Sequence, residues 1–314
     1  MERAVKQGVL SLYAERRTHP SLVRGRVKIE EHSLRIYCVG NPELAETLMR
    51  LPELLLHPAC KTIKSEKKVK VVRLPLRIGR TITSVYVKQH NALFFRHRLG
   101  SLFCASAALR ALSGAATLLQ EGYATARPIA AVEYRRRGIL VKSFYLAEEI
   151  AGARTITNYW REHVLSLKGM ERHLKRWTVL RALAGLLKSL HAKGIYHNDL
   201  KASNILVRDK GTSTDVVFSL IDLQGVKKCF HVSKRRRIKN LAQLNRTLGN
   251  YLSRTERLFF IKSYGGDQSY DRNKKRSLIR NILEETSRQI IKEKSRHLIT
   301  AGASAYGCKN PENS

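Results

Sequence analysis

The sequence predicts an α+β fold of two lobes, with a small antiparallel-sheet N-lobe and a larger, mainly helical C-lobe. Three observations support this prediction. Residues 62–64, 69–74 and 81–88 read as three strands separated by polar turns. Residues 170–193 have the periodicity of a long helix. Two short apolar runs, at 205–207 and 216–221, flank a turn around Gly211 and predict a hairpin.

The long helix is predicted from the spacing of its apolar residues. They recur every three to four positions and so share one face of a helix. Lys193 lies in the last turn, and Gly194 is a favourable C-terminal stop. The apolar positions are Leu174, Trp177, Leu180, Leu183, Leu187 and Leu190.

The most informative stretch follows this helix. Residues 197–206 read H-N-D-L-K-A-S-N-I-L, and Asp222 follows the second apolar run. Phosphoryl transfer from ATP needs a carboxylate that orients and deprotonates a hydroxyl, which Asp199 supplies. It also needs an amide and a second carboxylate for magnesium, and a lysine that offsets the charge of the moving group. Asn204, Asp222 and Lys201 provide these groups in one loop and one strand end.

The predicted hairpin sets the geometry of the metal ligands. Two antiparallel strands joined at Gly211 carry Asn204 at one end back towards Asp222 at the other. Magnesium prefers hard oxygen donors. We therefore expect Asn204 and Asp222 to bind one Mg²⁺ ion. The order of helix, loop, hairpin and aspartate is that of the larger lobe of protein-kinase-like folds.

The strands of the smaller lobe predict the nucleotide-binding groups. Lys88 ends the third strand, where a lysine can reach the α- and β-phosphates of ATP. The turn at 65–68 takes the place of a glycine-rich loop but contains no glycine, so we expect the side chain of Lys67 or Lys68 to substitute. Residues 144–152 fit an extended hinge, and the backbone of Glu149 and Ala151 is expected to bind adenine.

One protein-kinase feature is missing from the sequence. The lysine of such a lobe normally pairs with a helix glutamate. No acidic residue occurs between Lys88 and Gln120, and Glu121 comes after the expected end of the helix. The usual ion pair is therefore either absent or replaced by another partner.

The composition describes a globular and strongly basic protein. The 314 residues are 43% hydrophobic and carry a net charge of +34. Five scattered cysteines without a C-x-x-C pair favour reduced thiols in the cytoplasm over a zinc site. The N-terminus does not resemble a signal peptide, and residues 99–119 read as a packed helix rather than a membrane span.

The positive charge predicts an anionic partner. Basic clusters lie at 135–137, 234–237 and 274–276. Nucleic acid, anionic lipid and phosphorylated glycolipid all attract such a surface. No zinc-finger spacing or aromatic RNA-recognition motif accompanies the clusters, so nucleic acid is not the expected partner.

The chain is expected to divide into four parts. Residues 1–58 form an N-terminal extension, 59–147 the N-lobe, 148–270 the C-lobe, and 271–314 a basic helical tail with a frayed end.

Several segments together resemble the bacterial lipopolysaccharide core kinases of the Kdo/WaaP family. The most distinctive segment, R-R-R-I-K-N-L-A-Q-L-N at 235–245, is followed by L-S-R-T-E-R-L at 252–258. The similarity spans roughly residues 64–266. The other matching segments are V-Y-V-K at 85–88, G-Y-A-T-A-R-P-I-A at 122–130, H-N-D-L-K-A-S-N at 197–204 and L-I-D-L-Q-G-V at 220–226.

The resemblance implies an ATP- and Mg²⁺-dependent kinase that phosphorylates a sugar hydroxyl, on Kdo or heptose, of the lipid A–core glycolipid. It implies Asp199 as catalytic base, Lys201 near the γ-phosphoryl group, Lys88 at the nucleotide, and Asn204 and Asp222 as metal ligands. The enzyme would lie peripherally on the cytoplasmic face of the inner membrane, whose anionic surface would bind it. Two alternatives remain: a kinase acting on protein Ser/Thr or on small molecules, and a catalytically silent, basic binding protein.

Overall fold

The computed structural model describes residues 26–31, 34–39, 42–92, 100, 104–209, 215–266 and 271–306. Contacts divide the chain into two compact units. The first, here called the sheet unit, comprises Met1–Ala153 and Ser219–Lys227. The second, the helical unit, comprises Arg154–Phe218 and Lys228–Ser314.

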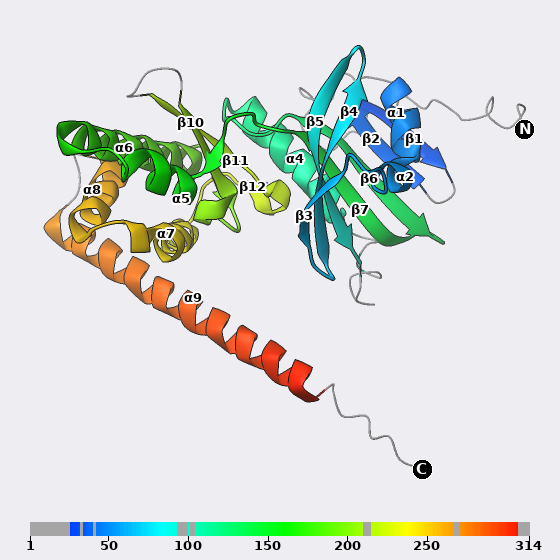
Figure 1. Ribbon diagram of the computed structural model, residues 1–314. Coiled ribbons are helices and arrows are strands. Elements are labelled where there is room, and N and C mark those ends of the chain that lie inside the picture. The colour runs from blue at the N-terminus through cyan, green and yellow to red at the C-terminus, as the bar shows by residue number, and fades with distance from the viewer. Residues whose placement is uncertain are drawn as a thin grey trace, which may run out of the picture. The chain divides into compact units, whose positions relative to one another are not determined.

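The sheet unit is built on seven antiparallel strands in the order β1-β2-β6-β7-β5-β4-β3 (Figure 1). The three predicted strands are confirmed as β3, β4 and β5. The described residues before position 58 add β1 and β2 at the other edge of the same sheet. The strands are β1 Arg26–Glu31, β2 Leu34–Val39, β3 Lys61–Ser65, β4 Val69–Ile78, β5 Thr81–Asn91, β6 Pro128–Arg136 and β7 Ile139–Glu148.

Helices cover both faces of this sheet, because successive residues of a strand point to opposite sides. Ala130 and Val132 of β6 belong to a core shared with α1 (Pro42–Met49) and α2 (Leu51–Leu54). Ala131, between them, belongs to a second core with α4 (Ala107–Gln120). The helix predicted over 99–119 is described from Ala107 onwards, where Ser106 caps it by accepting a hydrogen bond from the amide of Leu109.

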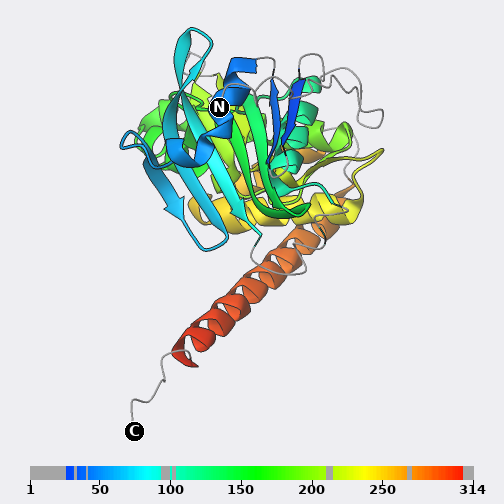
Figure 2. The ribbon, with the colours of Figure 1, turned by 90° about the vertical axis from the view of Figure 1, so that its right-hand side faces the viewer.

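The helical unit contains the predicted long helix as α6 (Gly169–Ala192) and the first predicted hairpin strand as β10. The second, β11, begins in the helical unit and ends in the sheet unit. Strands β11, β10 and β8 form a small sheet in that order. The tail helix predicted at the C-terminus is α9 (Figure 2). The remaining elements are β8 Arg154–Thr155, α5 Ile156–Tyr159, a π-helical turn Trp160–Val164, β9 Ile195–His197, a 3₁₀ turn Ala202–Asn204, β10 Ile205–Asp209, β11 Val216–Leu220, β12 Val226–Lys228, α7 Lys234–Leu248, a 3₁₀ turn Gly249–Tyr251, α8 Arg254–Gly265 and α9 Arg272–Tyr306.

The apolar face of α6 begins later than predicted. Leu180, Leu183 and Leu187 are fully buried, but Leu174 is 56% exposed. Its neighbour Lys175 is buried instead, because its ammonium group donates to Asp209 at 2.7 Å. The placement of Leu174 on the buried face was therefore wrong: an ion pair, rather than apolar packing, holds the first turns of α6.

Within the helical unit, α9 contacts α7 and α8 contacts α6. Thr286 of α9 is hydrogen-bonded to Asn245, and Glu293 pairs with Arg246. The tyrosine of α8, Tyr264, is hydrogen-bonded to His191 at 2.8 Å. In the part of the chain that the structure describes, no helix is long and apolar enough to cross a bilayer.

Candidate active site

The sheet unit brings Lys88 and Asp222 into direct contact. The ammonium group of Lys88, on β5, lies 2.6 Å from Oδ1 of Asp222, and both side chains are about four-fifths buried. The helix next to β5, α4, carries no acidic residue. The prediction that the usual lysine–glutamate pair is missing or replaced is therefore confirmed in its second form: the partner of Lys88 follows β11.

Asp222 is held in place by its own unit. Its backbone is left-handed, with φ 60° and ψ 53°, a conformation that aspartate tolerates better than most residues. Before it, the amide of Leu220 donates to Ala124, and the Thr125 hydroxyl donates to the carbonyl of Leu220 at 2.6 Å. After it, the carbonyl of Leu223 lies so close to Gly114 of α4 that a methyl group would overlap it.

The predicted hinge leaves the sheet at the end of β7. The Glu149 amide donates to the carbonyl of Ser84 at 2.9 Å, and its carboxylate accepts two hydrogen bonds from Arg73 of β4. These bonds to Arg73 hold the pKa of Glu149 below its usual value. Ala151 lies in an exposed turn that the Ala153 amide closes by donating to Ile150 at 3.2 Å.

Lys67 lies in the turn between β3 and β4. The amide of Glu66 donates to Val69 at 2.9 Å across this turn. The side-chain amide of Asn91, at the end of β5, donates to the carbonyl of Lys67 at 3.0 Å. The turn is thus fixed to the strand that carries Lys88, while the Lys67 side chain is exposed.

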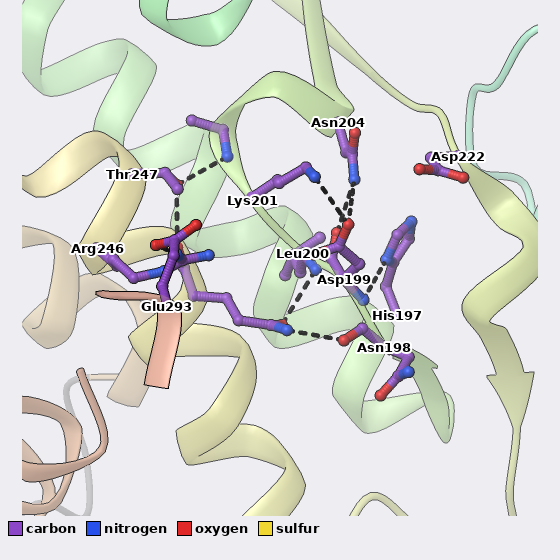
Figure 3. Close-up of polar contacts among 12 residues, drawn as sticks. His197, Asn198, Asp199, Leu200, Lys201, Asn204, Asp222, Arg246, Thr247 and Glu293 are labelled. Carbon is purple, nitrogen blue, oxygen red and sulfur yellow. Dashed lines mark hydrogen bonds and ion pairs between the residues drawn. The ribbon is translucent and has the colours of Figure 1, made fainter. Parts of the chain in front are cut away.

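The helical unit brings together the other three predicted residues, as Figure 3 shows. The Lys201 ammonium group lies 3.0 Å from Oδ2 of Asp199. The side-chain amide of Asn204 donates to the backbone carbonyl of Asp199 at 2.8 Å and to its Oδ2 at 3.3 Å. Nδ1 of His197 accepts the amide of Asp199 at 3.2 Å. The loop therefore presents a carboxylate with a cation beside it and an amide beneath it.

Helix α7 fixes the backbone of this loop. Gln243 accepts the amide of Leu200 at 3.0 Å and donates to the carbonyl of Asn198 at 2.7 Å. The hydroxyl of Thr247 accepts the amide of Ala202 at 2.9 Å (Figure 3). These contacts satisfy backbone groups that a turn leaves without partners in its own segment.

Asn240, one turn before Gln243, completes this set. It donates to the carbonyl of His197 at 2.6 Å, and its Oδ1 lies 3.1 Å from Nε2 of His191. Burial holds the pKa of His191 below its usual value, although the bond to Asn240 opposes the shift. We call Asn240, Gln243 and Thr247 the α7 tether.

No role was predicted for the tether, although Asn240 and Gln243 lie in the family-like segment at 235–245. A signal was present: the three polar side chains recur at intervals of three and four residues among the buried leucines of α7. Polar residues at helical spacing on an otherwise apolar face indicate a buried hydrogen-bonding partner.

Comparison with protein families identifies the chain. The model of the family described as "Lipopolysaccharide kinase (Kdo/WaaP) family" matches residues 74–264, more than half of the sequence. The chain belongs to the lipopolysaccharide kinase (Kdo/WaaP) family. The match includes Lys88, Asp199, Asp222 and the whole of α7. Comparison with curated proteins gives no match.

The fold agrees with this family. A solved structure described as "WaaP in complex with acyl carrier protein" is similar, with a TM-score of 0.52 and 23% sequence identity. The similarity covers 74% of this chain and 88% of that chain. The predicted α+β, protein-kinase-like fold and the predicted family are both confirmed. As a member of a lipopolysaccharide kinase family, the chain is assigned to the phosphotransferases.

Proposed function

We propose that this protein transfers the γ-phosphoryl group of ATP to a sugar hydroxyl, on Kdo or heptose, of the lipid A–core glycolipid. The observation that carries the proposal is the arrangement around Asp199, whose carboxylate is paired with Lys201 and held by Asn204. The family membership supports the glycolipid as acceptor.

Asp199 is proposed to accept the proton of the attacking hydroxyl. Its side chain is 45% exposed, so an acceptor can approach it. Lys201, 3.0 Å away, then stabilises the negative charge of the phosphoryl group during transfer. The Asn204 amide keeps the carboxylate in one orientation, which limits the rotations that would take it away from the hydroxyl.

Lys88 is proposed to bind the α- and β-phosphates of ATP. Its contact with Asp222 holds the ammonium group in place before nucleotide arrives. Lys67, on a turn fixed to the same strand, supplies a second cation for the phosphates. The backbone of Glu149 and Ala151 is proposed to bind the adenine edge.

Asn204 and Asp222 have the donor chemistry that magnesium requires. The amide nitrogen of Asn204 is used in the bonds to Asp199, which leaves its carbonyl oxygen as the donor for a metal. Asp222 adds a carboxylate. Both are hard oxygen donors of the kind that bind Mg²⁺. When bound, the ion would neutralise phosphate charge during transfer.

The protein is proposed to act peripherally on the cytoplasmic face of the inner membrane, where a glycolipid acceptor would be reached. The net charge of +34 supports attraction to an anionic surface.

Phosphate transfer to purified lipid A–core tests the reaction. We expect transfer from ATP in the presence of Mg²⁺ and none with a chelator. Asp222→Asn should weaken metal binding and abolish turnover while the protein stays folded. Mass spectrometry of lipid A–core from a host with and without the gene should show the loss of one phosphate and locate it. Transfer to protein or to a small metabolite, with none to the glycolipid, would assign the enzyme to another substrate. A chain that binds ATP but transfers nothing would be a silent relative.

A further inference from the structure

Phe230 is exposed to solvent over its whole side chain, with a relative accessibility of 107%. It lies in the segment between β12 and α7. Burying a phenylalanine stabilises a protein by roughly 1.5–3 kcal/mol, so complete exposure forgoes this gain. A single exposed apolar residue is common on protein surfaces, so Phe230 becomes informative only together with its neighbours.

The backbone on both sides of Phe230 is held by contacts within the helical unit. Before it, the amide of Cys229 donates to the carbonyl of Gly194 at 2.9 Å. Gly194 has a φ of +74°, and a side chain there would overlap the Cys229 carbonyl, so the two backbones meet closely. After it, Val232 is completely buried, and Arg237 donates to its carbonyl at 2.9 Å.

Cations flank Phe230 in the sequence. Between Asp222 and Glu256 the sequence contains nine lysines and arginines and no acidic residue. Lys228, Lys234, Arg235 and Arg236 are all exposed, as Phe230 is. We call residues 228–236 the docking segment.

Three of these cations destabilise α7 because they lie at its N-terminus. Lys234, Arg235 and Arg236 occupy the first turn of α7, which contains no acidic residue. The helix dipole disfavours positive charge at that end by about 0.3–1 kcal/mol for each residue. Charges that destabilise their own helix are readily explained when an external anion binds them.

The docking segment is connected to the loop that carries Asp199. The guanidinium group of Arg236 lies 5.4 Å from the centre of the Tyr196 ring and donates to the sulfur of Cys229 at 3.0 Å. The Tyr196 hydroxyl and the Lys239 ammonium group both donate to Oδ1 of Asn198, the residue before Asp199. A surface bound by this segment therefore lies beside the catalytic loop.

We propose that the docking segment binds an anionic lipid bilayer, with Phe230 inserted among the acyl chains and Lys234, Arg235 and Arg236 on the headgroup phosphates. An exposed apolar ring flanked by exposed cations matches both the acyl and the headgroup layer of such a surface. This inference rests on the proposed function, since the docking segment contacts the loop whose Asp199 is proposed to act on the glycolipid sugar. The proposal differs from a general attraction of the net charge to anionic lipid. It requires the protein to bind the bilayer through one side of the helical unit, where the docking segment lies.

Flotation of the full chain with vesicles, without ATP, tests the proposal. Wild type should bind phosphatidylcholine vesicles that contain phosphatidylglycerol, and pure phosphatidylcholine much less. Phe230→Ser should weaken binding roughly 10- to 100-fold. The triple variant K234Q/R235Q/R236Q should weaken it on the order of 100-fold at low salt.

Two matched controls separate docking from general attraction. K274Q/K275Q/R276Q removes the same charge from the start of α9, and Met170→Ser removes another exposed apolar side chain, on α6. Each should lose much less binding than its counterpart in the docking segment. Equal losses in the two triple variants, together with unchanged binding of Phe230→Ser, would overturn the proposal.

Insertion of residue 230 into the bilayer can be measured by tryptophan fluorescence. The Phe230→Trp variant adds an indole to the two of the wild type, Trp160 and Trp177. Lipids brominated in the acyl chains should quench the added fluorescence. Binding without this extra quenching would mean that position 230 stays outside the bilayer. A preference for RNA over anionic vesicles at the same ionic strength would replace the bilayer with nucleic acid.

These results do not depend on turnover. Lipid binding with no glycolipid phosphorylation would contradict the proposed function alone. Phosphorylation of detergent-dispersed glycolipid by a chain that fails to bind vesicles would contradict the docking proposal alone.

Discussion

Gly114 of α4 lies against the carbonyl oxygen of Leu223, with no room for a methyl group between them. Gly114→Ala should therefore displace the turn that follows Asp222 and destabilise the protein by about 1–3 kcal/mol, as overpacking does. Thermal unfolding and the Mg²⁺ dependence of turnover would measure the two effects. The control is Gly185→Ala in α6, where a methyl group meets open space and should be neutral or stabilising.

Asp199→Asn should lower the rate of phosphoryl transfer by about 10² to 10⁴, the contribution of a positioned base. Nucleotide affinity should change little, because the residue is proposed to contact the acceptor. Single-turnover rates and equilibrium ATP binding measure the two quantities. A variant that turns over at the wild-type rate would show that the carboxylate only shapes the loop.

Lys88→Ala should raise the KM for ATP more than the KM for the acceptor. The lysine is proposed to bind the nucleotide, and its removal also leaves Asp222 without the cation 2.6 Å away. Initial rates measured while each substrate is varied in turn would test this. If neither KM changed, nucleotide would have to bind away from β5.

The α7 tether should affect kcat more than KM. Thr247→Val keeps the shape of the side chain but removes the acceptor of the Ala202 amide, which costs about 1–3 kcal/mol when the group stays buried. We expect a lower kcat with an unchanged KM for ATP, and recovery in Thr247→Ser, which restores the hydroxyl. If Thr247→Val were less stable but its folded fraction kept full activity, the tether would stabilise the fold without positioning the catalytic loop.

His191 should make stability depend on pH. Its pKa in the folded protein is lowered, mainly by burial, so the unfolded chain binds a proton more readily. The free energy of unfolding should therefore fall as the pH drops below about 6.5, until the lowered folded pKa is reached. Denaturant titrations across this range should show a smaller decrease for His191→Gln than for wild type. Identical slopes would contradict this assignment.

Local patterns were sufficient to predict the elements with strong periodicity. Strands β3, β4 and β5, helix α6 and the hairpin strands all lie close to their predicted positions. Lys88 and the loop around Asp199 were found because short motifs carry them. The first turns of α6 were misread because Lys175 is buried by an ion pair with Asp209, which lies far along the chain.

The unpredicted features depend on contacts between distant segments. Strand β2 pairs with β6, nearly one hundred residues later, so no local pattern identifies it as part of the sheet. The tether joins α7 to a loop more than forty residues earlier. The partner of Lys88, Asp222, lies 134 residues away. The only sign of this in the sequence was that α4 contains no acidic residue that could pair with the lysine.

The ion pair of Lys88 has a consequence for control. In protein kinases the lysine's partner lies on a mobile helix, and rotation of that helix switches the enzyme on or off. Here the partner is Asp222 itself, and α4 has no acidic side chain to offer or withdraw. Movement of α4 alone cannot exchange one carboxylate for another. In the part of the chain that the structure describes, the ion pair of Lys88 therefore does not depend on the position of an acidic residue in α4.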